Sequence, residues 1–159
     1  MFYVIIITVV AVIDQFTKYL VLKYIGMGNE LEVIPDFLYL HCISNDGVAF
    51  GLLSNNIMVI GMISVMLVFV ILIFFLKFGS NFSNITRVTL ALFVGGGIGN
   101  VIDRVRLGYV VDFIDFRAIW VYIFNFADIC VVAGCILLVM SAVITGTDEP
   151  GKGRTDNGK

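Results

Sequence analysis

The chain has 159 residues, of which 60% are hydrophobic and 14% are charged, and its formal net charge is −2. Soluble domains carry about 25% charged residues, so this composition excludes an ordinary soluble domain and predicts a membrane protein. The slightly acidic balance and the lack of a basic run also exclude nucleic acid as a partner on electrostatic grounds.

The first apolar stretch, residues 2–25, is long enough to cross a hydrocarbon core of about 30 Å as a helix. It lacks the basic start and the small-residue cleavage site of a removable signal peptide, so we expect a permanent membrane helix. Asp14, Thr17 and Lys18 are spaced at i, i+3 and i+4 and therefore lie on one face of it.

The next segment, residues 28–53, lacks the pattern of a helix. It combines β-favouring residues with Pro35 and with the turn-forming run Asn45, Asp46 and Gly47. These signals predict a small strand-and-turn element on the outer side of the membrane, placed to cover a site. A plain connection between two helices is the alternative.

Further apolar stretches predict three more membrane helices, at residues 57–76, 84–102 and 118–145. The predicted fold class is therefore an all-α membrane protein with four transmembrane helices and a small extracytoplasmic β-type element between the first two. This integral-membrane domain is expected to occupy residues 1–145.

The charge of one short loop indicates the orientation. Lys77 and Arg87 lie between the second and third spans without an acidic residue beside them, which favours the cytoplasm for that loop. Four spans then place both termini in the cytoplasm. Residues 146–159 are polar and Gly-rich, so we expect a disordered cytoplasmic tail.

Inserting an ionisable side chain at the bilayer centre costs roughly 2.5 to 3.5 kcal/mol of free energy. Such residues inside a span therefore tend to have a partner or a role. Asn100, Asp103 and Arg104 share a face of the third span, and Asn125 and Asp128 share a face of the fourth. We expect these polar faces to converge with that of the first helix. A second interpretation assigns structural ion pairs: Asp14 with Lys18, and Asp103 with Arg104 or another neighbour.

Four glycines precede Asn100 in the third span, at positions 95, 96, 97 and 99. Gly95 and Gly99 have the small-xxx-small spacing that lets two membrane helices approach closely. The pattern predicts helix packing. So many small residues would also leave room for a substrate.

Asp112 and Asp128 have no cation at i+3 or i+4, and both are expected at the same membrane interface. Two neighbouring carboxylates do not easily both ionise, so one keeps a proton while the other acts as a base toward water, which suits peptide hydrolysis. Capping of helices or binding of a cation is the alternative. His41 is the one histidine, so we expect no metal site and no Ser-His-Asp triad. Asp115 and Arg117 are expected to be solvated.

Five motifs in order resemble those of the bacterial lipoprotein signal peptidases, also called signal peptidase II, which are aspartic membrane proteases. They are DQFTK at 14–18, NDGVAFG at 45–51, GGIGNVIDR at 96–104, GYVVDFID at 108–115 and FNFAD at 124–128. The resemblance covers nearly the whole chain apart from the tail. One departure is Val48, where the family's loop motif commonly has Ala.

The resemblance implies that Asp112 and Asp128 are the catalytic residues. The positions that match the family's supporting or substrate-binding residues are Asp14, Lys18, Asn45, Gly47, Gly96, Asn100, Asp103, Arg104, Asn125 and Ala127. No metal and no cofactor is implied.

The resemblance also implies an endopeptidase of the bacterial cytoplasmic membrane, with its active site on the extracytoplasmic side. Its substrates would be diacylglyceryl-modified prolipoproteins, cut on the amino side of the lipidated cysteine. Membrane lipids would be partners, and globomycin-type cyclic peptides would be inhibitors. Two other classes were weighed from the residues: a small proton-coupled transporter, for which the expected internal repeat is not evident, and a non-catalytic lipoprotein-binding factor.

Overall fold

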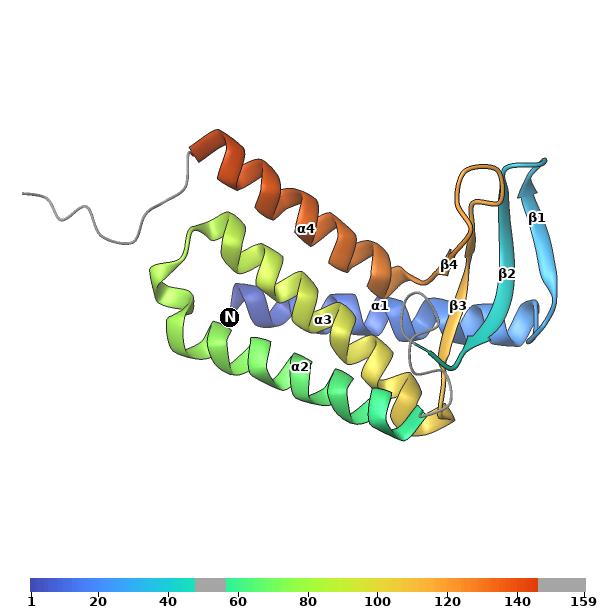
Figure 1. The fold of residues 1–159 in the computed structure, drawn as a ribbon, viewed down its shortest axis with the longest axis horizontal. Helices are drawn as coiled ribbons and strands as arrows, with labels where there is room; N and C mark the ends of the chain where they lie inside the picture. The colour runs from blue at the N-terminus through green and yellow to red at the C-terminus, as the bar shows by residue number, and fades with distance from the viewer. Residues whose placement is uncertain (48–56, 146–159) are drawn as a thin grey trace, which may run out of the picture.

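The computed structural model describes residues 1–47 and 57–145, and it shows a helical bundle with a small sheet at one end (Figure 1). The helices are α1 (Phe2–Tyr24), α2 (Ile57–Phe78), α3 (Asn84–Leu107) and α4 (Phe126–Thr145), with a short 3₁₀ turn, η2 (Gly79–Asn81), after α2. The strands are β1 (Glu30–Ile34), β2 (Leu38–Asn45), β3 (Val110–Asp115) and β4 (Ile123–Phe124).

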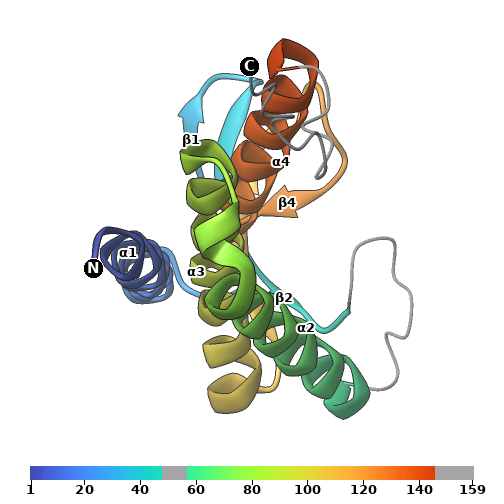
Figure 2. The same ribbon diagram turned by 90° about the vertical axis from the view of Figure 1, so that its left-hand side faces the viewer.

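Helix α3 is the centre of the bundle, because it contacts each of the other three helices (Figure 2). Within the described residues, three helical segments are long and apolar enough to cross a membrane: Phe2–Tyr24, Gly61–Asn81 and Asn84–Leu107. The apolar part of α4, Phe126–Ser141, is shorter. The structure is thus that of a mostly helical membrane protein, in agreement with the expected class.

The glycines of α3 lie where this helix approaches its neighbours most closely. A Cβ atom on Gly95 would lie 2.9 Å from the Cβ of Val10 in α1, and one on Gly96 would lie 2.7 Å from the carbonyl oxygen of Ala127 in α4. The other two glycines of this stretch approach α2 and α1 as closely. The packing interpretation of the glycine run is therefore confirmed.

Replacing Gly96 by Ala is expected to destabilise the protein by about 1 to 3 kcal/mol, because the new methyl group meets backbone of α4 that must move. Thermal unfolding in detergent measures the effect as a lower Tm. Gly61→Ala in α2 is the matched control, since among the described residues no atom outside the nearby backbone of α2 lies within 4 Å of its new Cβ. Equal Tm values for the two variants would contradict the role of Gly96 in packing.

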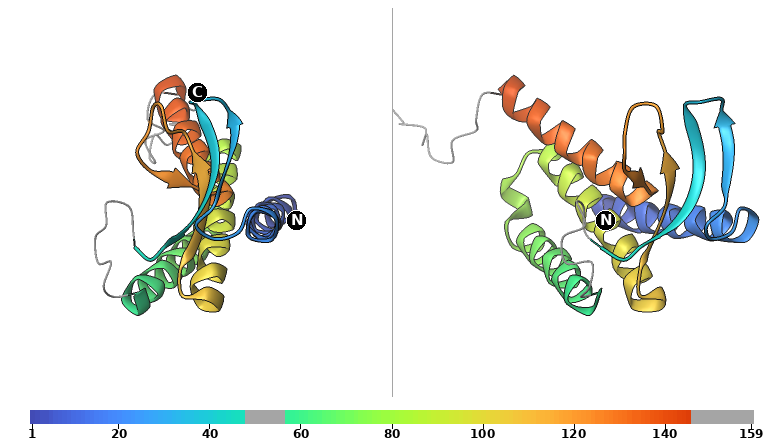
Figure 3. Two further views of the ribbon diagram at one scale, coloured as in Figure 1. Left: turned by 90° about the vertical axis from the view of Figure 1, so that its right-hand side faces the viewer. Right: turned by 45° about the vertical axis from the view of Figure 1, so that its right-hand side comes forward.

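The four strands form one antiparallel sheet in the order β1-β2-β3-β4, which lies beyond the ends of α2, α3 and α4 and beside the last turns of α1 (Figure 3). One face packs on the end of α1, where Val21 contacts a cluster that includes Cys42 and Phe113. The β2–β3 ladder is irregular: Leu40 is opposite Ile114 and Ile43 is opposite Asp112. Two residues of β2 therefore stand against Phe113 alone, which is a β-bulge.

Three sequence-based expectations need correction. The all-α class with a β element confined to residues 28–53 is wrong in extent, because β3 and β4 after α3 belong to the same sheet. The helix expected from residue 118 begins at Phe126. The helix expected to end at residue 102 continues to Leu107, where Gly108 ends it with the left-handed φ of 84° that glycine adopts easily. Residues 48–53 of the expected outer loop and the expected tail, 146–159, lie outside the described residues.

Candidate active site

Asp112 lies in the middle of β3 and is almost fully buried, with 1% of its surface exposed. Two side-chain amides hold its carboxylate. Asn45 at the end of β2 donates from Nδ2 to Oδ2 at 2.7 Å, and Asn125 donates from Nδ2 to Oδ1 at 2.6 Å. Neighbouring strands thus fix this acid, because Asn45 and Asp112 lie on paired strands near their shared end.

Asp128 lies in the first turn of α4 and forms a reciprocal pair with Asn125. Its Oδ2 accepts the backbone N–H of Asn125 at 3.2 Å, and its own N–H donates to Oδ1 of Asn125 at 3.0 Å. Two bonds of this kind are typical of a capped helix start. Asn125 therefore contacts both acids and sets their relative position.

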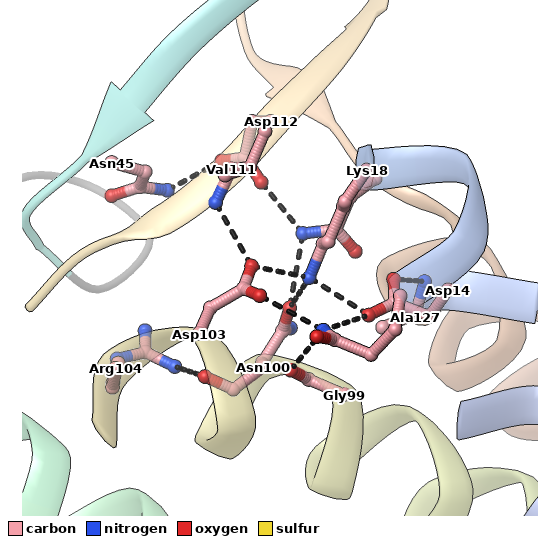
Figure 4. Close-up of polar contacts among 12 residues, drawn as sticks. Asp14, Lys18, Asn45, Gly99, Asn100, Asp103, Arg104, Val111, Asp112 and Ala127 are labelled. Carbon is pink, nitrogen blue, oxygen red and sulfur yellow. Dashed lines mark hydrogen bonds and ion pairs between the residues drawn. The ribbon is translucent and has the colours of Figure 1, made fainter. Parts of the chain in front are cut away.

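Asn100 of α3 joins Asp128 to the bundle interior, and Figure 4 shows its contact with Lys18. Its Nδ2 donates to Asp128 at 3.0 Å, while its Oδ1 accepts from Asn125 at 3.0 Å and from Lys18 Nζ at 2.8 Å. Because Lys18 can only donate, it fixes which way the Asn100 amide points. The amide nitrogen of Asn100 is thereby directed at Asp128.

Lys18 is buried between two carboxylates, at 2.9 Å from Asp14 in α1 and 2.8 Å from Asp103 in α3. Each acid also accepts a backbone N–H: Asp14 that of Ala127 at 3.0 Å, and Asp103 that of Val111 at 3.1 Å. This cluster ties the first helix to the start of α4 and to β3. The structural ion-pair interpretation is confirmed for Asp14 with Lys18, whereas Asp103 pairs with Lys18 and not with Arg104.

Gln15 is a further residue of this site, and it was not among the residues predicted from the sequence. Its Nε2 donates to Asp103 Oδ1 at 2.8 Å and to the carbonyl oxygen of Gly99 at 3.1 Å, so it joins α1 to α3 beside the ion cluster. Its place inside the DQFTK motif was the available signal. A neutral amide does not stand out as a charged residue does in an apolar span.

A cavity of about 550 Å³ is lined by both acids, and we call it the dyad cavity. Arg104 lies at its edge and donates to the carbonyl oxygen of Gly47 at 3.3 Å, which holds the end of the β2 segment over α3. Apolar side chains of α2, α4 and the β4 region complete the wall: Leu67, Val131, Val132, Trp120, Ile123 and Phe124. A polar floor with apolar walls suits a substrate that is part peptide and part lipid.

Burial and the negative charge of Asp128 raise the pKa of Asp112 from 3.8 to about 6, and the amides of Asn45 and Asn125 oppose this rise. The folded protein therefore binds this proton more tightly than the unfolded chain does. The stability that protonation contributes is present at low pH and is lost as the pH rises toward and through about 6.

This pKa predicts a measurable pH dependence of stability. The Asp112→Asn variant has no proton to lose at this position, so its Tm is expected to rise by several degrees relative to that of the wild type between about pH 4.5 and about pH 7.5. Differential scanning fluorimetry of both proteins in one detergent measures the difference. A difference that stays constant over this range would show that Asp112 has an ordinary pKa.

The structure brings the predicted site residues together around the dyad cavity and the ion cluster beside it, and Gly96 packs on Ala127 at the start of α4.

The expectation that Asp115 is solvated is wrong, since only 7% of its surface is exposed. Arg117 is half exposed and is not simply solvated, because it donates to Asp115 at 3.0 Å and to Glu30. Within residues 1–47 and 57–145 no three His, Cys, Asp or Glu side chains are grouped as metal ligands.

Comparison with known proteins places this site in a family, because residues 6–144 match the family described as signal peptidase (SPase) II. The chain belongs to the signal peptidase II family. Lipoprotein signal peptidases are similar along most of their length: that of Caldanaerobacter subterraneus subsp. tengcongensis is 41% identical over 90% of this chain and 97% of its own. That of Fusobacterium nucleatum subsp. nucleatum is 36% identical over 90% of this chain and 87% of its own.

A solved structure of a bacterial membrane enzyme also superposes on this signal peptidase II chain, with a TM-score of 0.80 and 32% sequence identity. The match covers 96% of this chain and 93% of the other. Family membership and this shared fold make the protein a multi-pass membrane hydrolase that acts as a protease on signal peptides.

Proposed function

We propose that this protein removes signal peptides from diacylglyceryl-modified prolipoproteins by cleaving on the amino side of the lipidated cysteine, with Asp112 and Asp128 as its catalytic residues. Family membership supports prolipoproteins as the substrates. The observation that carries the catalytic assignment is the pairing of the two acids through Asn125 at one cavity.

The two carboxyl groups divide the chemistry between them. Asp128 as carboxylate takes a proton from a water, whose oxygen attacks the scissile carbonyl carbon, while protonated Asp112 donates a hydrogen bond to the carbonyl oxygen. The C–N bond of the tetrahedral intermediate then breaks, and the proton held by Asp128 passes to the leaving amine. The raised pKa of Asp112 supports its role as the partner that keeps a proton.

Side chains around the acids position them and the substrate. Asn45 and Asn125 hold Asp112, and Asn100 holds Asp128. Arg104, at the edge of the dyad cavity, is placed to bind a peptide carbonyl or a lipid oxygen. The exposed apolar side chains of α2 and α4 would face the bilayer, from which a lipid-modified substrate would enter the dyad cavity.

We assign α4 as a fourth transmembrane helix, which places both termini in the cytoplasm and the dyad cavity at the extracytoplasmic surface of the bacterial cytoplasmic membrane. The 20 residues of α4 span about 30 Å at 1.5 Å per residue, and Lys77 and Arg87 flank the turn between α2 and α3. Membrane lipids would surround the exposed apolar faces of the helices. Globomycin-type cyclic peptides would inhibit by occupying the dyad cavity.

A gel-shift assay with purified protein in lipid tests this proposal. One prolipoprotein is offered with and without its diacylglyceryl group, and only the modified form is expected to be cleaved, because the lipid brings the peptide to a site at the membrane surface. Equal cleavage of both forms would reject the lipid requirement. A folded wild-type protein that cleaves neither form between acidic and neutral pH would reject the peptidase activity itself.

A further inference from the structure

A second cavity, of about 570 Å³, lies beside the sheet and is not part of the mechanism above. We call it the outer cavity. The end of the sheet and the connection from β3 to β4 form its walls, and its lining includes His41, Asp115, Arg117, Ala118, Trp120 and Ile123. Figure 3 shows this connection at the side of the sheet, next to the start of α4.

The outer cavity adjoins the dyad cavity. Trp120 and Ile123 line both of them. Asp112 and Asp115 lie three residues apart on β3, so their side chains point to opposite faces of the sheet, one toward each cavity. The two cavities therefore adjoin at β4, the edge strand of the sheet.

Strand β4 offers a backbone edge along this path. It is the last strand of the sheet and pairs with β3 through Phe124 opposite Ile114 and Ile123 opposite Asp115. Among the described strands, none pairs with its other edge. An exposed edge of this kind is a template for an extended peptide, which gains main-chain hydrogen bonds there.

The polar wall of the outer cavity is held in place by Arg117. Its guanidinium donates to Asp115 and Glu30 and lies 3.9 Å from the centre of the Tyr39 ring. His41 Nδ1 lies 3.8 Å from both of these acids. A lining of charged pairs beside exposed apolar side chains suits a polar peptide. An acyl chain in this cavity would exclude water from the charged groups, which costs free energy.

We propose that the outer cavity binds the residues of the prolipoprotein that follow the lipidated cysteine, and that the chain passes in extended form along the edge of β4 from the dyad cavity. This inference rests on the proposed function. The apolar signal peptide stays in the bilayer, so the polar chain after the cysteine must leave the site on the sheet side of the dyad cavity, where the outer cavity lies.

A pair of lipid-modified substrates tests the subsite. Both carry the same signal peptide and lipidated cysteine, but one ends as an amide at the cysteine and the other continues for about ten residues. Filling the outer cavity by Ala118→Trp is expected to raise the ratio of KM (long substrate) to KM (short substrate) about tenfold. Val33→Trp, at an exposed position of β1, is the matched control and leaves this ratio unchanged.

Two outcomes would overturn the subsite. If Ala118→Trp raises both KM values equally, the β3–β4 connection acts on the enzyme or its membrane contact as a whole. If it raises neither, the outer cavity is not used. Cleavage of the short substrate by the wild type reports on the proposed function separately, because that substrate cannot reach the outer cavity.

Photo-crosslinking gives a second measurement that does not depend on the folding of Ala118→Trp. The long substrate carries a benzophenone at the third residue after the cysteine, and the Asp112→Asn protein keeps it uncleaved. Mass spectrometry is expected to place the crosslink within residues 117–123. Crosslinks confined to α2 or α4 would show that the chain takes another path.

Discussion

Replacing Asp128 or Asp112 by Asn lowers the rate of prolipoprotein cleavage by at least about a thousandfold. An amide at position 128 cannot take the proton of the water, and an amide at position 112 offers the developing oxyanion a much less acidic hydrogen-bond donor than a carboxylic acid. Asn has the size of Asp and remains a favourable residue at a helix start, so Asp128→Asn keeps the capped beginning of α4. The measurement is a single-turnover cleavage assay in lipid, with the Tm of each variant recorded alongside.

The control for these variants is Asp36→Asn. Asp36 lies in the exposed turn between β1 and β2, away from the dyad cavity, and Asn tolerates its positive φ of 56°. This variant is expected to cleave at the wild-type rate. Full activity in a folded Asp128→Asn protein would refute the dyad, and a requirement for only one of the two acids would indicate catalysis by a single carboxylate.

Lys18→Met is expected to cause the largest loss of stability, about 3 to 5 kcal/mol. It removes the cation that lies between Asp14 and Asp103 and leaves two buried carboxylates without a counter-charge. It also frees the amide of Asn100 to turn away from Asp128. Thermal unfolding and cleavage are measured on the same preparation, and both are expected to fall.

Lys23→Met provides the comparison, since Lys23 lies in the last turn of the same helix, is exposed and packs over tyrosine rings. Its effect on stability is expected to stay within about 0.5 kcal/mol. Adding Asp103→Asn to Lys18→Met removes one of the uncompensated charges and should recover part of the lost Tm. No difference between the Lys18 and Lys23 variants would mean that the cluster is hydrated.

Much of this architecture was accessible from the sequence, because a membrane imposes simple requirements on it. Long apolar runs had to be helices, so α1 and α2 were predicted nearly to the residue. A charge inside such a run had to face a partner, so Asp14, Lys18 and Asp103 were expected to lie inward and do so. The glycines of α3 showed where helices approach closely.

The sheet was harder to predict, because its strands are far apart in the sequence. Strand β3 closely follows α3, and its six residues contain two acids, so this stretch was expected only as a polar segment after the third span and not as a strand. Only its pairing with β2 identifies it as a strand. The short β4 has two residues, too few to carry a periodic signal, so the start of α4 was placed eight residues too early, at 118 instead of Phe126.

The bulge in β2 has a consequence for how this protein tolerates change. Side chains alternate between the two faces of a strand, so the extra residue between Leu40 and Ile43 determines which face Asn45 is on and lets it reach Asp112. The earlier part of β2 keeps its pairing with β3, in which Leu40 is opposite Ile114. Removing or adding one residue here would turn Asn45 to the opposite face. Natural relatives should therefore vary in residue type at positions 41 and 42 far more readily than in the number of residues between them.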